Sequence, residues 1–233
     1  MQQMCVIPAQ GDKHRKGLKY RMGKVGADKA PRLSVIRKDP WYKNLVACYE
    51  RATPESIAAG MTWYEDANKF ALTLSQKYHI DVAVIAQVIA ALSPAAKWER
   101  NKQDADELIK AYYHRGFIGA KAVTCCTYGP NKLKALEILT GRLVLTEKQG
   151  FKTANFWQNI ANPTGKHHVT IDRHALRVLE GSDQRGAVAI KPHQYKRAAY
   201  VYKTLAGEKG LLPNQLQAIT WVQRLSELNN KGK

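Results

Sequence analysis

The chain has 233 residues, of which 45% are hydrophobic and 24% are charged, so it is long enough to bury one substantial core and is not compositionally disordered. Its formal net charge of +18 indicates a polyanionic partner, with nucleic acid favoured over a membrane, although charge alone does not choose among DNA, RNA and acidic protein surfaces. The longest apolar run, residues 82–92, is about half of the roughly 20 residues that a membrane span needs, and no N-terminal run suits a signal peptide, so we expect a soluble, cytoplasmic protein.

Residues 11–38 form a basic segment of weak periodicity, in which ten lysines and arginines accompany only two aspartates. A solvated tail would explain this composition. We favour an arm that follows the phosphate backbone of nucleic acid and adds strongly salt-dependent affinity. Its predicted contact residues are Lys13, Arg15, Lys16, Lys19 and Arg21. The predicted organisation is therefore a flexible basic arm over residues 1–38 and one helical domain over residues 39–233.

From residue 40 onward the hydrophobic pattern is helical. Thr53-Pro54-Glu55 is a good helix opening, with the threonine as cap and the proline at the first helical position. An apolar stripe at helical spacing follows, which we interpret as core rather than as a platform for base stacking: Trp63, Ala67, Phe70, Ala71 and Leu74. Residues 81–92 are apolar nearly all round and predict a central buried helix. No alternating strand of useful length occurs, so the predicted fold class is all-α.

The stretch from residue 145 to residue 179 predicts two short amphipathic helices separated by the turn ANPTGKHH. Gly150 and Lys152 stand at the start of the first helix, and Asp172 stands at the start of the second, 20 positions after the lysine. A helix N-terminus carries unpaired N–H groups and the positive end of the helix dipole, so it suits a phosphate or a carboxylate. The same dipole disfavours a protonated amine. Lys152 is therefore predicted to titrate low enough to act as a nucleophile, particularly if partly buried.

Two motifs in this stretch resemble those of the endonuclease III-type DNA glycosylases, the helix-hairpin-helix (HhH-GPD) superfamily. The motif GFKTAN resembles the hairpin that carries the Schiff-base lysine, and TIDRHALRV resembles the loop that carries the catalytic aspartate. The matching positions are Gly150, Lys152, Thr153, Ala154, Asn155, Asp172, His174, Arg177 and Val178. The proline and first glycine of the family's hairpin are replaced by residues of the TEKQ run, so the turn is expected to be reshaped. Two weaker resemblances precede it in the family's order, in ALSPAAKWERNKQDADELI and TYGPNKLKALEIL.

The resemblance implies a two-lobed helical fold with a cleft that faces Lys152 and Asp172, and a helix-hairpin-helix motif over about residues 133–162. Asp172 would be the catalytic carboxylate of a base-excising enzyme that flips a modified or damaged base out of duplex DNA, and Lys152 a possible Schiff-base nucleophile that adds AP-lyase activity. The residues implied in DNA contact are Gly150, Lys148, Thr153, Lys97 and Trp98, besides the basic arm. Asn155, His174 and Arg177 would brace the loop and helix. Trp98 either packs on a base or covers a helix end.

Cysteine and histidine usage predicts no metal site and no cofactor. Cys125 and Cys126 are adjacent in sequence, which argues against a disulfide framework and for a reducing compartment. The iron–sulfur cluster of many endonuclease III relatives must be absent, because no cysteine follows Cys126. The histidines lack zinc-ligand spacing. The expected protein is a monomer bound to double-stranded DNA, and its small size and high positive charge would suit a phage protein that works in the host cytoplasm.

Two other functions remain open at this stage. One is a transferase that modifies a DNA base on a glycosylase-like scaffold, and the other is a non-catalytic DNA-binding module that uses the hairpin and the arm alone. Without the resemblance, Lys152 would be read as a solvated surface charge and Asp172 as a helix cap. The structure must therefore show whether the two side chains share one site.

Overall fold

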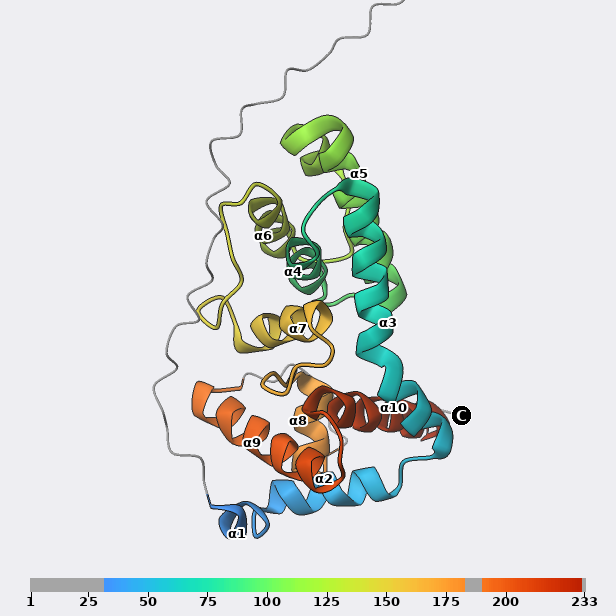
Figure 1. The fold of residues 1–233 in the computed structure, drawn as a ribbon, viewed down its shortest axis with the longest axis vertical. Coiled ribbons are helices and arrows are strands. Elements are labelled where there is room, and N and C mark those ends of the chain that lie inside the picture. Colours follow the sequence, from blue (N-terminus) through green and yellow to red (C-terminus); the bar gives the residue numbers. More distant parts are fainter. Residues whose placement is uncertain (1–31, 183–189, 232–233) are drawn as a thin grey trace, which may run out of the picture. The chain divides into compact units, whose positions relative to one another are not determined.

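A computed structural model of the chain describes residues 32–182 and 190–231, and these ranges contain helices but no strand (Figure 1). The helices are α1 (Leu33–Ile36), α2 (Pro40–Glu50), α3 (Pro54–Tyr78), α4 (Val82–Leu92), α5 (Trp98–Ala122), α6 (Gly129–Leu139), α7 (Phe151–Ala161), α8 (Arg173–Glu180), α9 (Pro192–Glu208) and α10 (Pro213–Lys231). The predicted all-α class is confirmed for the described residues. None of their helices is long and apolar enough to cross a membrane.

Most of the predicted basic arm lies outside the described residues, including Lys13, Arg15, Lys16, Lys19 and Arg21. Its last part, residues 32–38, is folded: α1 lies here, and Ile36 is buried in a hydrophobic cluster with residues of α2 and α9. Arg37 also forms a 2.8 Å ion pair with Glu208 at the end of α9. The folded unit therefore begins before residue 39, where the sequence placed its start.

The first of two lobes is built around α4, which is the central buried helix that the sequence predicted. Every residue from Ile85 to Leu92 is buried, because α3, α5, α6 and α7 all pack against this helix. Asp81 caps its start by accepting a 2.7 Å hydrogen bond from the backbone N–H of Ala83. The apolar stripe of α3 contributes Ala67, Ala71 and Leu74 to the same core.

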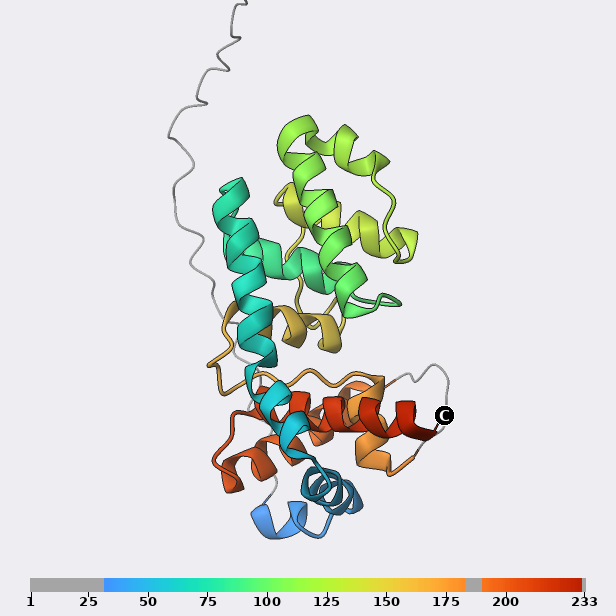
Figure 2. The same cartoon turned by 90° about the vertical axis from the view of Figure 1, so that its right-hand side faces the viewer.

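The second lobe combines α2 from the start of the described chain with α8, α9 and α10 from its end. Leu45, Leu179 and Tyr202 are fully buried in its core. The chain thus begins in one lobe, forms the other, and returns. Figures 1 and 2 both show α10 crossing the N-terminal part of α3. A Cβ atom at Gly60 would lie 2.4 Å from Ile219 Cα, so only glycine allows this close crossing.

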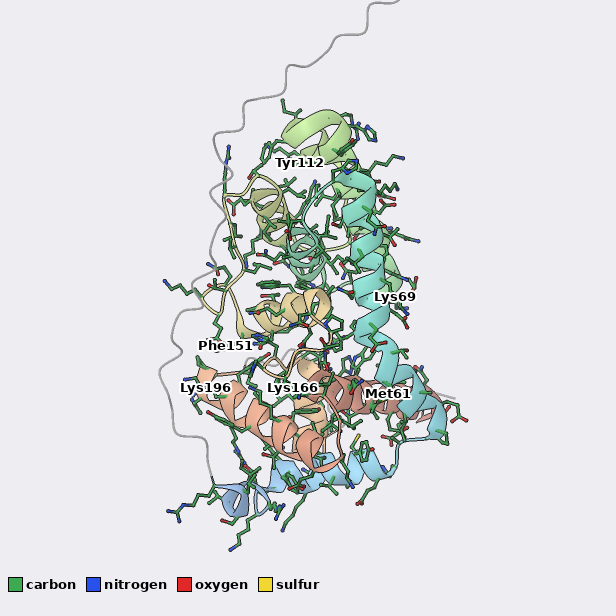
Figure 3. The ribbon with its side chains drawn as sticks, viewed as in Figure 1. Met61, Lys69, Tyr112, Phe151, Lys166 and Lys196 are labelled. Atoms are coloured by element: carbon green, nitrogen blue, oxygen red, sulfur yellow. The ribbon has the colours of Figure 1, made fainter. Side chains whose placement is uncertain are left out.

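The two lobes also meet along the start of α7. There the centroid of the Phe151 ring lies 5.2 Å from that of the Tyr195 ring on α9. A second contact joins the lobes at the crossing of α3 and α10, where the backbone carbonyl of Met61 accepts a 3.4 Å hydrogen bond from Gln215 Nε2. Figure 3 labels Phe151 and Met61 at this boundary. The loop and helix starts that carry the predicted site residues therefore lie where the lobes join.

The helix-hairpin-helix region differs in detail from the expected motif. The connection between α6 and α7 runs over residues 140–150, and both helices pack on α4 rather than closely on each other. Side chains hold this connection in place: Leu145 donates its N–H to Gln87 Oε1 at 2.8 Å and accepts a 2.9 Å hydrogen bond from Trp157 Nε1 through its carbonyl. The proline and first glycine of the glycosylase hairpin motif are absent from this connection, as the sequence showed, and the connection is correspondingly longer than a tight hairpin turn.

Candidate active site

The backbone at the start of α7 is arranged around Gly150. This residue has φ 139° and ψ 127°, a conformation that side chains disfavour, and it caps α7 without a side-chain hydrogen bond to the first turn. Thr153 instead donates its hydroxyl to the Gly150 carbonyl at 3.1 Å. The first N–H groups of α7 are therefore not capped by a side chain, and the positive end of the helix dipole lies beside Lys152.

Lys152 is partly buried and lines a cavity at the junction of the lobes. Burial lowers the pKa of its amine, and the nearby guanidinium of Arg173 lowers this pKa further, while the charge of Asp172 opposes both effects. Burial is the largest of these causes. The amine is therefore biased toward its neutral, nucleophilic form, as the sequence predicted for a lysine in this position.

Asp172 lines the same cavity from the start of α8. Its Oδ1 accepts a 2.8 Å hydrogen bond from the backbone N–H of Ala175, so the carboxylate caps the helix. The preceding residues are fixed by the buried hydroxyl of Tyr195, which donates to the Val169 carbonyl at 2.7 Å and accepts from the Ile171 N–H at 3.0 Å. This clamp determines where the carboxylate lies.

The cavity draws its walls from α3, α5, α7, α10, the connection between α4 and α5, and the segment before α8. Its volume is about 130 Å³, roughly ten times what one ordered water requires, so it can admit an organic ring. The lining residues are Trp63, Tyr64, Ser93, Ala96, Trp98, Asn101, Lys152, Phe156, Thr170, Asp172, Gln217, Ala218 and Trp221. Both halves of the predicted catalytic pair thus face one space, although they start different helices.

Aromatic rings form one side of this cavity. The centroid of the Trp63 ring lies 5.0 Å from that of Trp98, 5.7 Å from that of Trp221 and 6.1 Å from that of Phe156. Trp63 also packs against the core of the first lobe. The sequence interpretation of its stripe as core was therefore incomplete, because Trp63 and Phe156 serve both the core and the cavity wall. Aromatic faces of this kind can stack on a planar ligand.

Polar side chains on the cavity wall were missed by sequence reasoning. Tyr64 donates its hydroxyl to Gln217 Oε1 at 2.8 Å, and Asn101 donates its Nδ2 to the Ile89 carbonyl at 3.2 Å. All three side chains are buried. The available signal was a polar residue among the apolar residues of an inward helical face, as for Asn101, which lies with Ala105 and Leu108 on the buried face of α5.

The other predicted site residues take three kinds of position. Trp98 lines the cavity, whereas Lys97 and Lys148 are exposed at the starts of α5 and α7. Asn155 Oδ1 accepts a 3.0 Å hydrogen bond from His168 Nδ1, and its Nδ2 donates to the Phe151 carbonyl at 2.8 Å, so this side chain joins α7 to the following loop.

His174 and Arg177 lie on α8, beyond the cavity lining. His174 is partly buried, and burial lowers its pKa, while Asp172 opposes that change. Arg177 forms a 3.0 Å ion pair with Glu180 and lines a separate cavity with Arg51 and Arg224. Neither residue faces the cavity of Lys152. Across residues 32–182 and 190–231, no cluster of three or more histidine, cysteine, aspartate or glutamate side chains could hold a metal.

These features define a helical protein with two lobes and an aromatic cavity lined by a partly buried lysine and a helix-capping carboxylate. Residues 29–228 match a family model described as "Family of unknown function (DUF7178)", and the chain belongs to this family. The matched range includes every residue of the cavity lining. No curated protein and no solved structure matches the chain. Its function must therefore be inferred from the site.

Proposed function

We propose that this chain is a DNA glycosylase-like enzyme of helix-hairpin-helix type, which extrudes a base from duplex DNA and cleaves its N-glycosidic bond. The observation that carries the proposal is that Lys152 and Asp172 line one aromatic cavity, with burial favouring the neutral form of the lysine amine. An enzyme that acts on a base in a duplex must first take that base out of the stack, and stacking walls beside a nucleophile suit such a ligand.

In the proposed reaction the neutral Nζ of Lys152 attacks C1′ of the deoxyribose. The bond from C1′ to the base nitrogen breaks, and its electron pair leaves with the base, which takes up a proton. The amine then loses its protons as the sugar ring opens, so that lysine and sugar share a Schiff base. Water hydrolyses this linkage, or β-elimination cleaves the strand before hydrolysis.

Asp172 would stabilise the positive charge that develops on the sugar as the glycosidic bond breaks. One of its oxygens, Oδ1, is used by the helix cap, and among the described residues Oδ2 has no hydrogen-bond partner that would occupy it. The cap therefore orients the carboxylate through Oδ1 and leaves Oδ2 available to the substrate. Should Lys152 not attack, the same carboxylate can deprotonate a water that attacks C1′ instead.

Binding of the duplex is attributed to three basic or polar features. The uncapped start of α7 at Gly150 suits a phosphate, and exposed Lys148 and partly buried Thr153 lie beside it. Lys97 at the start of α5 flanks Trp98 of the cavity wall. The net charge of +18 supplies sequence-independent attraction to the phosphate backbone.

Borohydride trapping on a panel of duplexes with damaged and modified bases tests this proposal. Wild-type protein should form a covalent adduct with at least one duplex, and Lys152→Gln should form none. Lys43→Gln is the matched control, because it removes one exposed lysine from α2, a helix that contributes no residue to the cavity lining or to the proposed duplex contacts, and it should trap like the wild type.

The products separate the rival functions. Abasic sites without any trapped adduct would assign the reaction to Asp172 and water. A changed base with no abasic site would indicate the transferase, and tight duplex binding with no product on any member of the panel would leave only the DNA-binding module.

A further inference from the structure

One buried polar atom of the cavity wall has no hydrogen-bond partner among the described residues. Asn101 is 1% exposed and donates Nδ2 to the Ile89 carbonyl, an arrangement that leaves Oδ1 as the unused acceptor. Within the described residues, Oδ1 has no hydrogen-bond partner. Buried polar atoms in folded proteins are almost always paired. In the described part of the chain, Asn159 and Asn214 also have an unpaired Oδ1 but do not line this cavity, so Asn101 is the residue at which a ligand in the cavity can supply the missing donor.

Gln217 presents the complementary group on the same cavity. Its Oε1 accepts the hydroxyl hydrogen of Tyr64, so the orientation of the amide is fixed and Nε2 is left as the donor. Among residues 32–182 and 190–231, nothing accepts a hydrogen bond from this Nε2. The wall thus offers one acceptor from α5 and one donor from α10, between aromatic rings.

We propose that Asn101 and Gln217 form the specificity-determining pair of the cavity, in which Asn101 Oδ1 accepts an N–H of an extruded nucleobase and Gln217 Nε2 donates to an acceptor on the same base edge. Trp63, Trp98 and Trp221 would hold the plane of that base. This inference rests on the proposed function, because it takes DNA as the source of the base. It names residues that the reaction at C1′ does not use.

The chemistry of the pair defines the ligand class. A base must offer an N–H donor beside an acceptor, as the hydrogen-bonding edge of an unmodified base does, and methylation of that donor must abolish the fit. A site built to bond a particular polar group rejects an analogue that lacks the group, because the buried partner is then left unpaired. Purely aromatic walls would tolerate the methylated base equally well.

Duplexes that carry one test base opposite an abasic analogue provide the experiment, since extrusion of an unpaired base costs only unstacking. Affinity is measured by fluorescence anisotropy at one fixed salt concentration, for the four natural bases and for a duplex without the test base. The readout is the ratio of the Kd of the baseless duplex to the Kd with each base. Wild-type protein should prefer at least one base, and methylating its donor N–H should remove that preference.

Asn101→Leu should reduce the preference by about five- to tenfold, as expected for one lost hydrogen bond, with no change for the baseless duplex. Asn214→Leu is the matched control: Asn214 is also fully buried, donates Nδ2 to a backbone carbonyl and has an unpaired Oδ1, but it does not line the cavity. If Asn101→Leu fails to fold, Gln217→Glu decides, because it keeps the acceptor for Tyr64 and replaces the Nε2 donor with a carboxylate oxygen; the added charge acts on the baseless duplex as well, so the ratio of the two Kd values isolates the lost donor.

Equal affinity of the wild type for all of the duplexes would overturn the proposal, as would an unchanged preference in folded Asn101→Leu or in Gln217→Glu. A protein that binds none of the duplexes would overturn this inference and the proposed function together. A base preference without abasic-site formation would count against bond cleavage alone and would support the assignment of the specificity-determining pair.

Discussion

Replacing Asp172 tests whether its charge serves the reaction or only the helix. The carboxylate accepts a 2.8 Å hydrogen bond from the Ala175 N–H, so part of its role is to cap α8. Asparagine caps as well as aspartate does, whereas alanine loses the cap at a cost of about 1 kcal/mol. For a unit of this size, that cost lowers Tm by about 2–4 °C. Asp172→Asn should therefore keep the Tm of the wild type, and Asp172→Ala should not.

The expected effect on activity is much larger than the effect on stability. Loss of one preorganised electrostatic group at a reacting centre costs about a hundred- to a thousandfold in rate, and asparagine cannot carry the negative charge. The rate of abasic-site formation on the preferred duplex should fall by this factor in Asp172→Asn, while thermal melts and duplex affinity remain close to those of the wild type.

Asp81 supplies the matched control for this experiment. It caps α4 through a 2.7 Å hydrogen bond from the Ala83 N–H and does not line the cavity, so Asp81→Asn removes the same charge from an equivalent helix position. This variant should keep full activity. The reasoning is refuted if Asp172→Asn retains activity within about twofold, or if Asp81→Asn loses as much.

Two more predictions concern pH and salt. Because burial lowers the pKa of Lys152, covalent trapping should rise with pH along a limb whose midpoint lies below the ordinary lysine value of 10.5. Asp172 raises that pKa, so Asp172→Asn should move the midpoint to lower pH, and a midpoint at or above 10.5 in the wild type would contradict the assignment. Deleting residues 1–31 should flatten the dependence of log Kd on log salt for duplex binding by about 0.9 per phosphate contact removed. The circular dichroism spectrum of the truncated protein should still be that of a helical protein. If the slope of log Kd against log salt did not change, the arm would make no phosphate contacts.

Helix positions in this chain follow from local patterns. The Thr53 cap, the apolar run of α4 and the helix starts at Lys152 and at Asp172 each depend on residues within one or two turns, and the structure places these elements as expected. The long connection before α7 was harder to foresee. Its course is fixed by the hydrogen bond from the Leu145 N–H to Gln87, a residue on a helix far earlier in the chain.

The cavity wall required information that no local pattern contains. Tyr64 and Gln217 are separated by 153 positions, and their hydrogen bond forms only because α10 crosses α3 at Gly60. A helical stripe indicates which face of α3 is inward, but it does not distinguish a position against the core from one beside a cavity. Trp63 packs against the core and also lines the cavity. Its helical spacing indicates only the first of these two roles, because periodicity reports burial alone.

The same long-range packing explains how a carboxylate and a partly buried lysine can line one cavity at the junction of two lobes. Each group stands at the start of its own helix, where the dipole stabilises the carboxylate of Asp172 and disfavours a proton on Lys152. Tyr195 of α9 fixes the segment before Asp172, and α7 packs on α4, so the two helix starts are held by different lobes. The crossing of α3 and α10 is what keeps these lobes together. A side chain larger than hydrogen at Gly60 should therefore disturb the cavity, although this glycine does not line it.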